Sequence, residues 1–184
     1  MRKFTVLVAS AFVVLGSGIV FTDDGGSRNY RLRLTGLEEA PLVISTNGRG
    51  TFRATINKDE TEIAWRLTYS NLEGTVQQAH IHVGAPNVTG GVSVFLCSNL
   101  GNGPAGTKPC PLPPLAGVVE DVSDAADVIG PTAQGVEAGA FAELITAIKA
   151  GKAYANVHST KWPSGEIRQN FPADDDHGGH GDHR

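Results

Sequence analysis

The sequence contains no local concentration of positive charge. Fifteen lysine and arginine residues face 19 aspartate and glutamate residues, which gives a formal net charge of -4. Proteins that bind nucleic acid displace counterions with basic stripes along the chain, and none is visible in the linear order. A basic amphipathic helix, the usual device for lying on a membrane surface, is also missing. We therefore expect no nucleic-acid partner.

Catalytic signatures are missing as well. No Gly-x-Ser-x-Gly nucleophile elbow and no phosphate-binding Walker loop occurs in the chain. Glu166, with Arg168 two residues further on, predicts a same-face ion pair rather than a general acid. The sequence predicts no catalytic residue and favours a non-enzymatic role.

Long apolar runs are scarce. One run, residues 4–15, follows Arg2 and Lys3 and precedes small residues, which is typical of a secretory signal peptide. It is shorter than the roughly 20 residues that span a bilayer, so an uncleaved anchor is the weaker interpretation. We expect residues 1–22 to be a signal peptide, no membrane span after its removal, and a secreted, extracellular or periplasmic protein.

Cysteine is limited to Cys97 and Cys110. No Cys-x-x-Cys spacing is present, which disfavours a thiolate zinc site. In an exported protein such a pair normally closes, so the sequence predicts one disulfide across a Gly- and Pro-rich loop.

Short segments with period-two alternation predict strands at residues 30–36, 51–56, 63–69, 78–83, 92–97, 154–159 and 166–171. Gly, Pro and Asn separate them, which indicates an all-β sandwich or barrel. Phe141, Leu144, Ile145 and Ile148 stand at helical spacing and predict one short helix near residues 139–150. We expect a β domain over residues 30–172.

The last residues, 173–184, hold only Ala, Asp, His, Gly and Arg, and predict a disordered tail. Its His177, His180 and His183 suit either loose collection of divalent metal or a solvated tail. Asn87 opens an Asn-Val-Thr glycosylation pattern, which we interpret first as a turn.

Three histidines carry the most specific chemistry. His80 and His82 fall on the same face of a predicted strand, about 6.6 Å apart along it at ~3.3 Å per residue. Tyr154, Asn156 and His158 share a face of a later strand. If the two faces adjoin, His80, His82 and His158 form a three-nitrogen site for copper or zinc. The alternative is a structural polar network with no metal.

Three motifs resemble the CHRD domain, a family first described in chordin. They are Leu-Thr-Gly-Leu-Glu-Glu-Ala-Pro at residues 34–41, Ala-His-Ile-His-Val-Gly at 79–84, and Tyr-Ala-Asn-Val-His-Ser at 154–159 followed by Pro-Ser-Gly-Glu-Ile-Arg at 163–168. The resemblance implies an extracellular immunoglobulin-like or Greek-key β-sandwich or barrel. Chordin holds growth factors, but its cysteine-rich modules are missing and the loop from Cys97 to Cys110 is an insertion, so that role is not transferred.

A weaker likeness is to copper/zinc superoxide dismutase. The His80-Ile81-His82 strand is similar to its copper-ligand strand, with His158 late in the chain, whereas its zinc-ligand run is missing. Two hypotheses result. The first is a secreted module that binds a protein partner or self-assembles within an extracellular or envelope assembly; the second is an exported copper-binding protein, with dismutase-like chemistry as its furthest extension.

Overall fold

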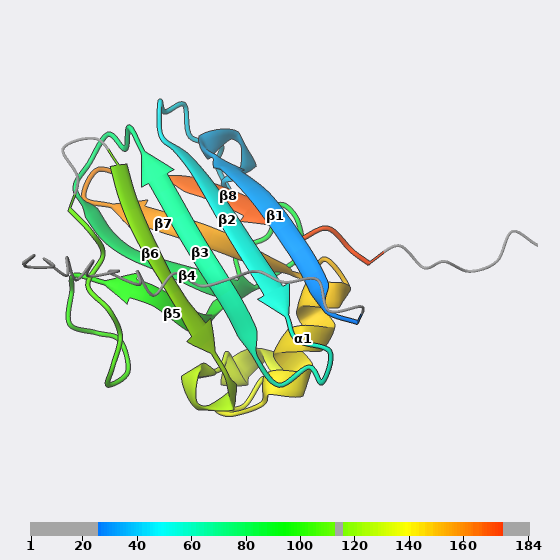
Figure 1. The fold of residues 1–184 in the computed structure, drawn as a ribbon. Helices are drawn as coiled ribbons and strands as arrows, with labels where there is room; N and C mark the ends of the chain where they lie inside the picture. The colour runs from blue at the N-terminus through cyan, green and yellow to red at the C-terminus, as the bar shows by residue number, and fades with distance from the viewer. Residues whose placement is uncertain (1–25, 113–115, 175–184) are drawn as a thin grey trace, which may run out of the picture.

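Eight antiparallel strands form one curled sheet, in the order β5-β4-β7-β8-β1-β2-β3-β6. The computed structural model describes residues 26–112 and 116–174. The strands are β1 (Arg28–Thr35), β2 (Arg49–Ile56), β3 (Ile63–Ser70), β4 (Val76–Val83), β5 (Gly91–Ser98), β6 (Ala116–Ser123), β7 (Ala153–Ser159) and β8 (Ile167–Asn170). Figure 1 shows β1, β2, β3 and β6 as a front layer and the other four strands behind it. The edge strands β5 and β6 approach each other, so the sheet is a nearly closed barrel and the all-β prediction is confirmed.

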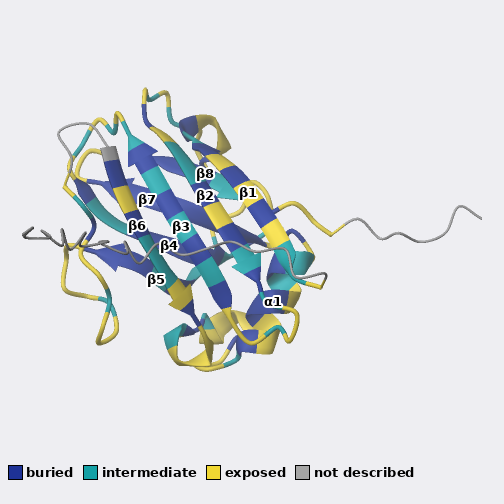
Figure 2. Ribbon diagram, viewed as in Figure 1, coloured by how far each residue is buried: buried dark blue, intermediate teal, exposed yellow. Residues whose placement is uncertain are grey.

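Alternating side chains fill the space between the layers. In β3, Ile63, Trp65, Leu67 and Tyr69 are buried while the residues between them are partly exposed. Figure 2 shows the same alternation along the other front strands. Period-two apolar placement therefore produces the core that the sequence predicts.

The predicted helix is confirmed as α1 (Phe141–Lys149), which lies at one end of the barrel. Its four predicted apolar residues are all buried. Gly151 follows it with φ +67°, the left-handed conformation that commonly ends a helix. Lys149, in the last turn, forms an ion pair with Glu60.

The strand β6 was not predicted. Only one of its valines, Val119, is buried, whereas Val118 and Val122 are exposed. Glu120 and Asp121 stand together and interrupt the alternation. The strand exists because all eight of its residues pair with β3, a tertiary contact that its own sequence does not reveal.

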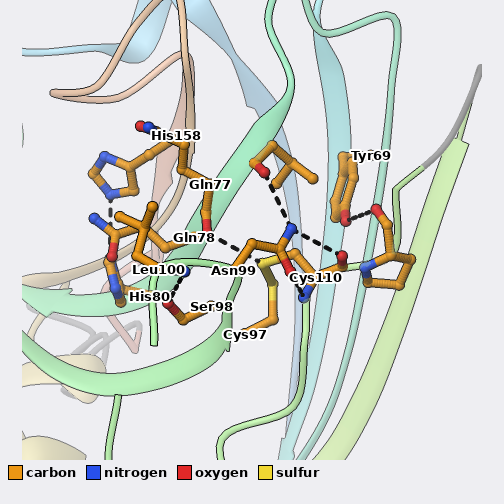
Figure 3. The surroundings of a disulfide bond; sticks show 12 residues. Tyr69, Gln77, Gln78, His80, Cys97, Ser98, Asn99, Leu100, Cys110 and His158 are labelled. Atoms are coloured by element: carbon orange, nitrogen blue, oxygen red, sulfur yellow. Dashed lines mark hydrogen bonds between the residues drawn. A yellow bond between two sulfur atoms is a disulfide. The ribbon is translucent and has the colours of Figure 1, made fainter. Parts of the chain in front are cut away.

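The predicted disulfide between Cys97 and Cys110 is confirmed. Asn99 fixes the loop beside it: its side chain donates to the carbonyls of Val76 and Cys110 and accepts from the Cys110 amide (Figure 3). Further along the loop, Lys108 donates to the Glu120 carbonyl on β6. The loop thus joins the two edge strands across the opening of the barrel.

The predicted signal peptide lies outside the described residues, as does the tail from residue 175 onward. Asp174 is described, and its carboxylate accepts from Arg28 and Tyr30 on β1. In the described part of the chain, no helix is long and apolar enough to cross a membrane.

Candidate metal centre

The sheet brings the three predicted histidines together. β4 and β7 are neighbours, and their register places His82 opposite Tyr154, His80 opposite Asn156 and Gln78 opposite His158. His158 is therefore a diagonal neighbour of His80, within reach of a side chain. Ala79, Ile81 and Val157 fill the core, so the three imidazoles lie on the outer face of this layer.

The rings converge on one point. The Nδ1 of His80 lies 3.2 Å from the Nε2 of His158 (Figure 3). One ligand atom from each of the three residues lies within 4.8 Å of the other two. Copper and zinc bonds to nitrogen of about 2.0–2.1 Å hold neighbouring ligands roughly 3–4 Å apart, so small rotations of the rings suffice.

Backbone carbonyls fix the orientation of two rings. The Nδ1 of His82 lies 3.0 Å from the Gly90 oxygen, and the Nδ1 of His158 lies 3.0 Å from the Pro163 oxygen. A carbonyl oxygen only accepts, so both Nδ1 atoms carry the proton and both Nε2 atoms hold a lone pair. This arrangement is the usual support of a metal-binding histidine.

The same reasoning fixes the third ring. Since the Nε2 of His158 is an acceptor, the Nδ1 of His80 donates to it. The Nε2 atoms of His80 and His82 are then lone-pair nitrogens that are buried with no hydrogen-bond partner in the described structure. Buried polar atoms normally find a partner, so these two nitrogens are the unsatisfied atoms of the cluster.

Aromatic rings surround the cluster. The Phe95 ring meets His80 edge to face at 4.4 Å between centroids. Tyr154 stacks on His82 at 4.7 Å with an interplanar angle of 2°. The Arg168 guanidinium in turn lies 3.5 Å from the centre of the Tyr154 ring. These contacts restrict the orientation of the imidazole rings.

Three loops cover this outer face. The loop after β4 supplies Gly90, where a Cβ would lie only 1.8 Å from the Val83 oxygen, so only glycine fits. Thr89 donates from that loop to the Ala40 carbonyl. Glu39, next to Ala40, accepts from Asn156 on β7. The loops explain why the histidines are buried although they do not belong to the hydrophobic core.

Burial keeps the imidazoles neutral. Desolvation, together with smaller contributions from the neighbouring His158 and His82, lowers the pKa of His80 to about 2. Desolvation likewise lowers the pKa of His82 to about 4. The pKa of His158 is lowered for the same reason. Neutral imidazole is the form that can bind a metal, and burial favours that form in all three rings.

The predicted ion pair between Glu166 and Arg168 is wrong. Glu166 accepts from Thr46 and the Glu73 amide, whereas Arg168 donates to the carbonyls of Ala85 and Val88. Glu166 precedes β8 and contacts the loops that carry Thr46 and Glu73. Arg168 lies in β8 and binds the loop after β4. Each residue therefore ties a different loop to the barrel.

Several supporting residues were not predicted from sequence: Glu39, Gly90, Phe95 and Pro163. Two of them act through a backbone oxygen, which leaves no trace in residue type. The Ala-Pro-x-x-x-Gly-Gly stretch after His82 and the Pro-Ser-Gly stretch after His158 were the available signals, because each marks a tight loop beside a histidine.

A nearly closed antiparallel barrel that carries three histidines on its outer face defines an all-β module. The family description "CHRD domain" matches residues 30–170. The chain therefore belongs to the CHRD domain family. Comparison with curated proteins gives no match. Comparison with solved structures gives none either.

Proposed function

We propose that this CHRD domain binds one transition-metal ion through His80, His82 and His158. The observation that carries the proposal is that one ligand nitrogen from each imidazole lies within 4.8 Å of the other two, while backbone carbonyls orient the rings of His82 and His158 through their Nδ1 atoms. Three neutral nitrogens and no carboxylate in the group favour copper or zinc over magnesium or calcium. Copper(II) stands above zinc in the general order of affinity, so copper is the first candidate.

Binding requires one rearrangement. The proton that His80 Nδ1 donates to His158 occupies the line between two ligand atoms. For an ion to be held there, His80 would have to carry its proton on Nε2, which has no partner in the described structure, instead of on Nδ1. The site then uses one Nδ1 and two Nε2 atoms and leaves a further coordination position for another ligand.

The test is the metal content of a chain shortened to residues 1–174. Removing the tail excludes loose binding by His177, His180 and His183. We expect one copper or zinc ion per chain by elemental analysis, and loss of that ion in His82→Ala and His158→Ala. Replacing the three tail histidines with Asn in the full chain is the matched control and retains the ion. A shortened, folded chain that binds neither metal disproves the proposal.

An exported interaction module is the second candidate. Family membership and the Cys97–Cys110 disulfide support an extracellular or periplasmic location. Leu37, Leu42 and Val43 are exposed by 71%, 74% and 66% in the loop after β1. Leu42 also borders a hollow of about 310 Å³ together with Trp162. This apolar loop supports contact with a protein partner or a second copy.

Replacing Leu37, Leu42 and Val43 together with Ser tests the second candidate. If the loop mediates self-association, the wild-type chain sediments as a concentration-dependent oligomer and the variant as a monomer. If both chains are monomers, the partner is a different protein. In that case envelope proteins that cross-link to the wild-type chain fail to cross-link to the variant. Equal capture by both chains contradicts a role for the loop.

A further inference from the structure

The outer face of the front layer carries a row of arginines that the linear sequence hides. In the register of β1, β2 and β3, Arg31 lies directly opposite Arg53, and Arg53 directly opposite Arg66. Arg33 lies two residues from Arg31 on the same face of β1, and Arg49 lies on β2. The expectation that the chain has no basic stripe holds along the sequence but not across the sheet.

The charges of this row are largely uncompensated. Arg66 forms an ion pair with Glu120. Arg31, Arg33 and Arg53 are exposed and form no hydrogen bond or ion pair within the described residues. Like charges directly opposite each other on neighbouring strands destabilise a sheet. Three adjacent strands with this arrangement therefore point to an anion that binds across them.

A hollow with a mixed polar and apolar lining, which includes Tyr69 and Val118, adjoins the row. Arg49, Thr51, Thr68 and Ser70 line a depression of about 200 Å³ at one end of the same strands. Thr51 is the register partner of both Arg33 and Thr68, so the hollow lies beside the arginines. Hydroxyls next to guanidinium groups suit a ligand that carries both hydroxyls and acidic groups.

We propose that this face binds an acidic polysaccharide through its sulfate or carboxylate groups. Arginine forms paired hydrogen bonds to such groups. Single-stranded nucleic acid is disfavoured because it needs aromatic platforms, and Phe52, Trp65 and Tyr69 face the core. A lipid surface is disfavoured because the outward positions of β1 and β2 are Arg, Thr and Asn, which do not insert into it, and the exposed Val118 and Val122 of β6 have the charged Glu120 between them.

The surface is separate from the histidine cluster. The arginines lie on the outer face of β1, β2 and β3, and the histidines lie on the outer face of β4 and β7, in the opposite layer of Figure 1. Binding at the arginine row therefore does not depend on the proposed metal, and metal-free protein can be used to test it.

The experiment compares two charge-matched double variants of the full chain on heparin and on polygalacturonate. Arg31→Gln/Arg53→Gln removes two charges from the row, and Lys58→Gln/Lys152→Gln removes two exposed charges away from it. We expect the arginine variant to bind about tenfold more weakly. The slope of log affinity against log salt concentration should fall by the amount that corresponds to about two lost charge contacts. The lysine variant changes the affinity by less than about twofold by the same principle.

Two further ligands test whether the acidic groups belong to a polysaccharide, a nucleic acid or a lipid. A mixed-sequence single-stranded DNA and phosphatidylglycerol vesicles, at equal charge concentration, bind more weakly than both polysaccharides if the proposal is correct. Equal losses in the two double variants overturn it, because binding then reflects net charge alone. Tighter binding to DNA or to the vesicles overturns the choice of polysaccharide.

Discussion

The Nδ1 of His80 donates to the Nε2 of His158 across 3.2 Å, between two neighbouring strands. This contact needs one proton between the two nitrogens, on Nδ1 of His80. A second proton, on Nε2 of His158, places positive charge in a buried site, which links the stability of the barrel to pH.

The first prediction is a loss of stability in mild acid. The folded pKa values of His80 and His82 are about 2 and about 4. An unfolded histidine titrates near 6.5, so below that pH the unfolded chain binds protons that the folded chain does not. Stability is complete above pH 6.5 and falls on acidification by about 1.4 kcal/mol per pH unit for each histidine.

Glu39 acts in the opposite direction and provides the control. Desolvation raises its pKa from 4.5 to about 7, so it stabilises the fold more as the pH falls through this range. Urea unfolding of metal-free protein at several pH values between 4.5 and 6.5 measures the combined effect of the histidines and Glu39 on the free energy of unfolding. Glu39→Gln removes the opposing contribution and makes the decline steeper. A Glu39→Gln variant whose stability is constant over this range contradicts the prediction.

The second prediction concerns the disulfide. Cys97 and Cys110 are 13 residues apart, and their loop joins the two edge strands. Replacing both with Ser lowers the free energy of unfolding by about 3 kcal/mol, because a loop of this size gains entropy in the unfolded chain. Thermal unfolding with and without reductant measures it. Reductant lowers the melting temperature of the wild type. If it lowers the melting temperature of the variant by the same amount, the disulfide is not the cause.

The third prediction concerns Arg168. Its side chain is buried, donates to Ala85, Val88 and Asn170, and covers Tyr154. Lys cannot reproduce the planar fork, so Arg168→Lys lowers the free energy of unfolding by at least about 2 kcal/mol. It also lowers the affinity of the proposed metal site, because the loop that carries Gly90 loses two anchors.

Arg33→Lys is the matched control for this substitution. Arg33 is exposed and has no partner in the described structure, so the exchange leaves stability within about 0.5 kcal/mol of the wild type. Denaturant titration of both variants gives the comparison. Equal effects of the two substitutions would show that the buried contacts of Arg168 contribute nothing.

The fourth prediction is that the arginine row weakens the fold. Arg53 lies between Arg31 and Arg66. Arg53→Thr relieves repulsion on both sides and places a β-branched residue in a strand, so stability rises by about 0.2–1 kcal/mol at low salt. The gain shrinks at 1 M salt, where charges are screened over about 3 Å. A gain that is independent of salt assigns the effect to strand propensity and contradicts repulsion.

The sequence predicts those parts of the molecule that local patterns determine. The alternation in β3 and the spacing of Phe141, Leu144 and Ile148 identified the strand and the helix. The His-x-His spacing showed that two imidazoles share a face. The neighbouring position of β7 is a property of the whole sheet, so the meeting with His158 was a conditional prediction.

Cross-strand register explains the remaining differences. It places Arg31, Arg53 and Arg66 in one row although 12 or more residues separate each pair along the chain. It also recruits β6, whose own alternation is weak, through β3. Glu166 and Arg168 looked like a pair in sequence, but the loops that each one contacts come from other parts of the chain.

The junction between β1 and β8 is one registered pair long, Thr35 with Arg168. The two four-stranded halves of the barrel are therefore connected there by little backbone bonding and mainly by interior packing. All three histidines reside in strands of the same half. A small displacement of one half relative to the other would therefore leave unchanged the registered pairs between β4 and β7 that bring His80 close to His158.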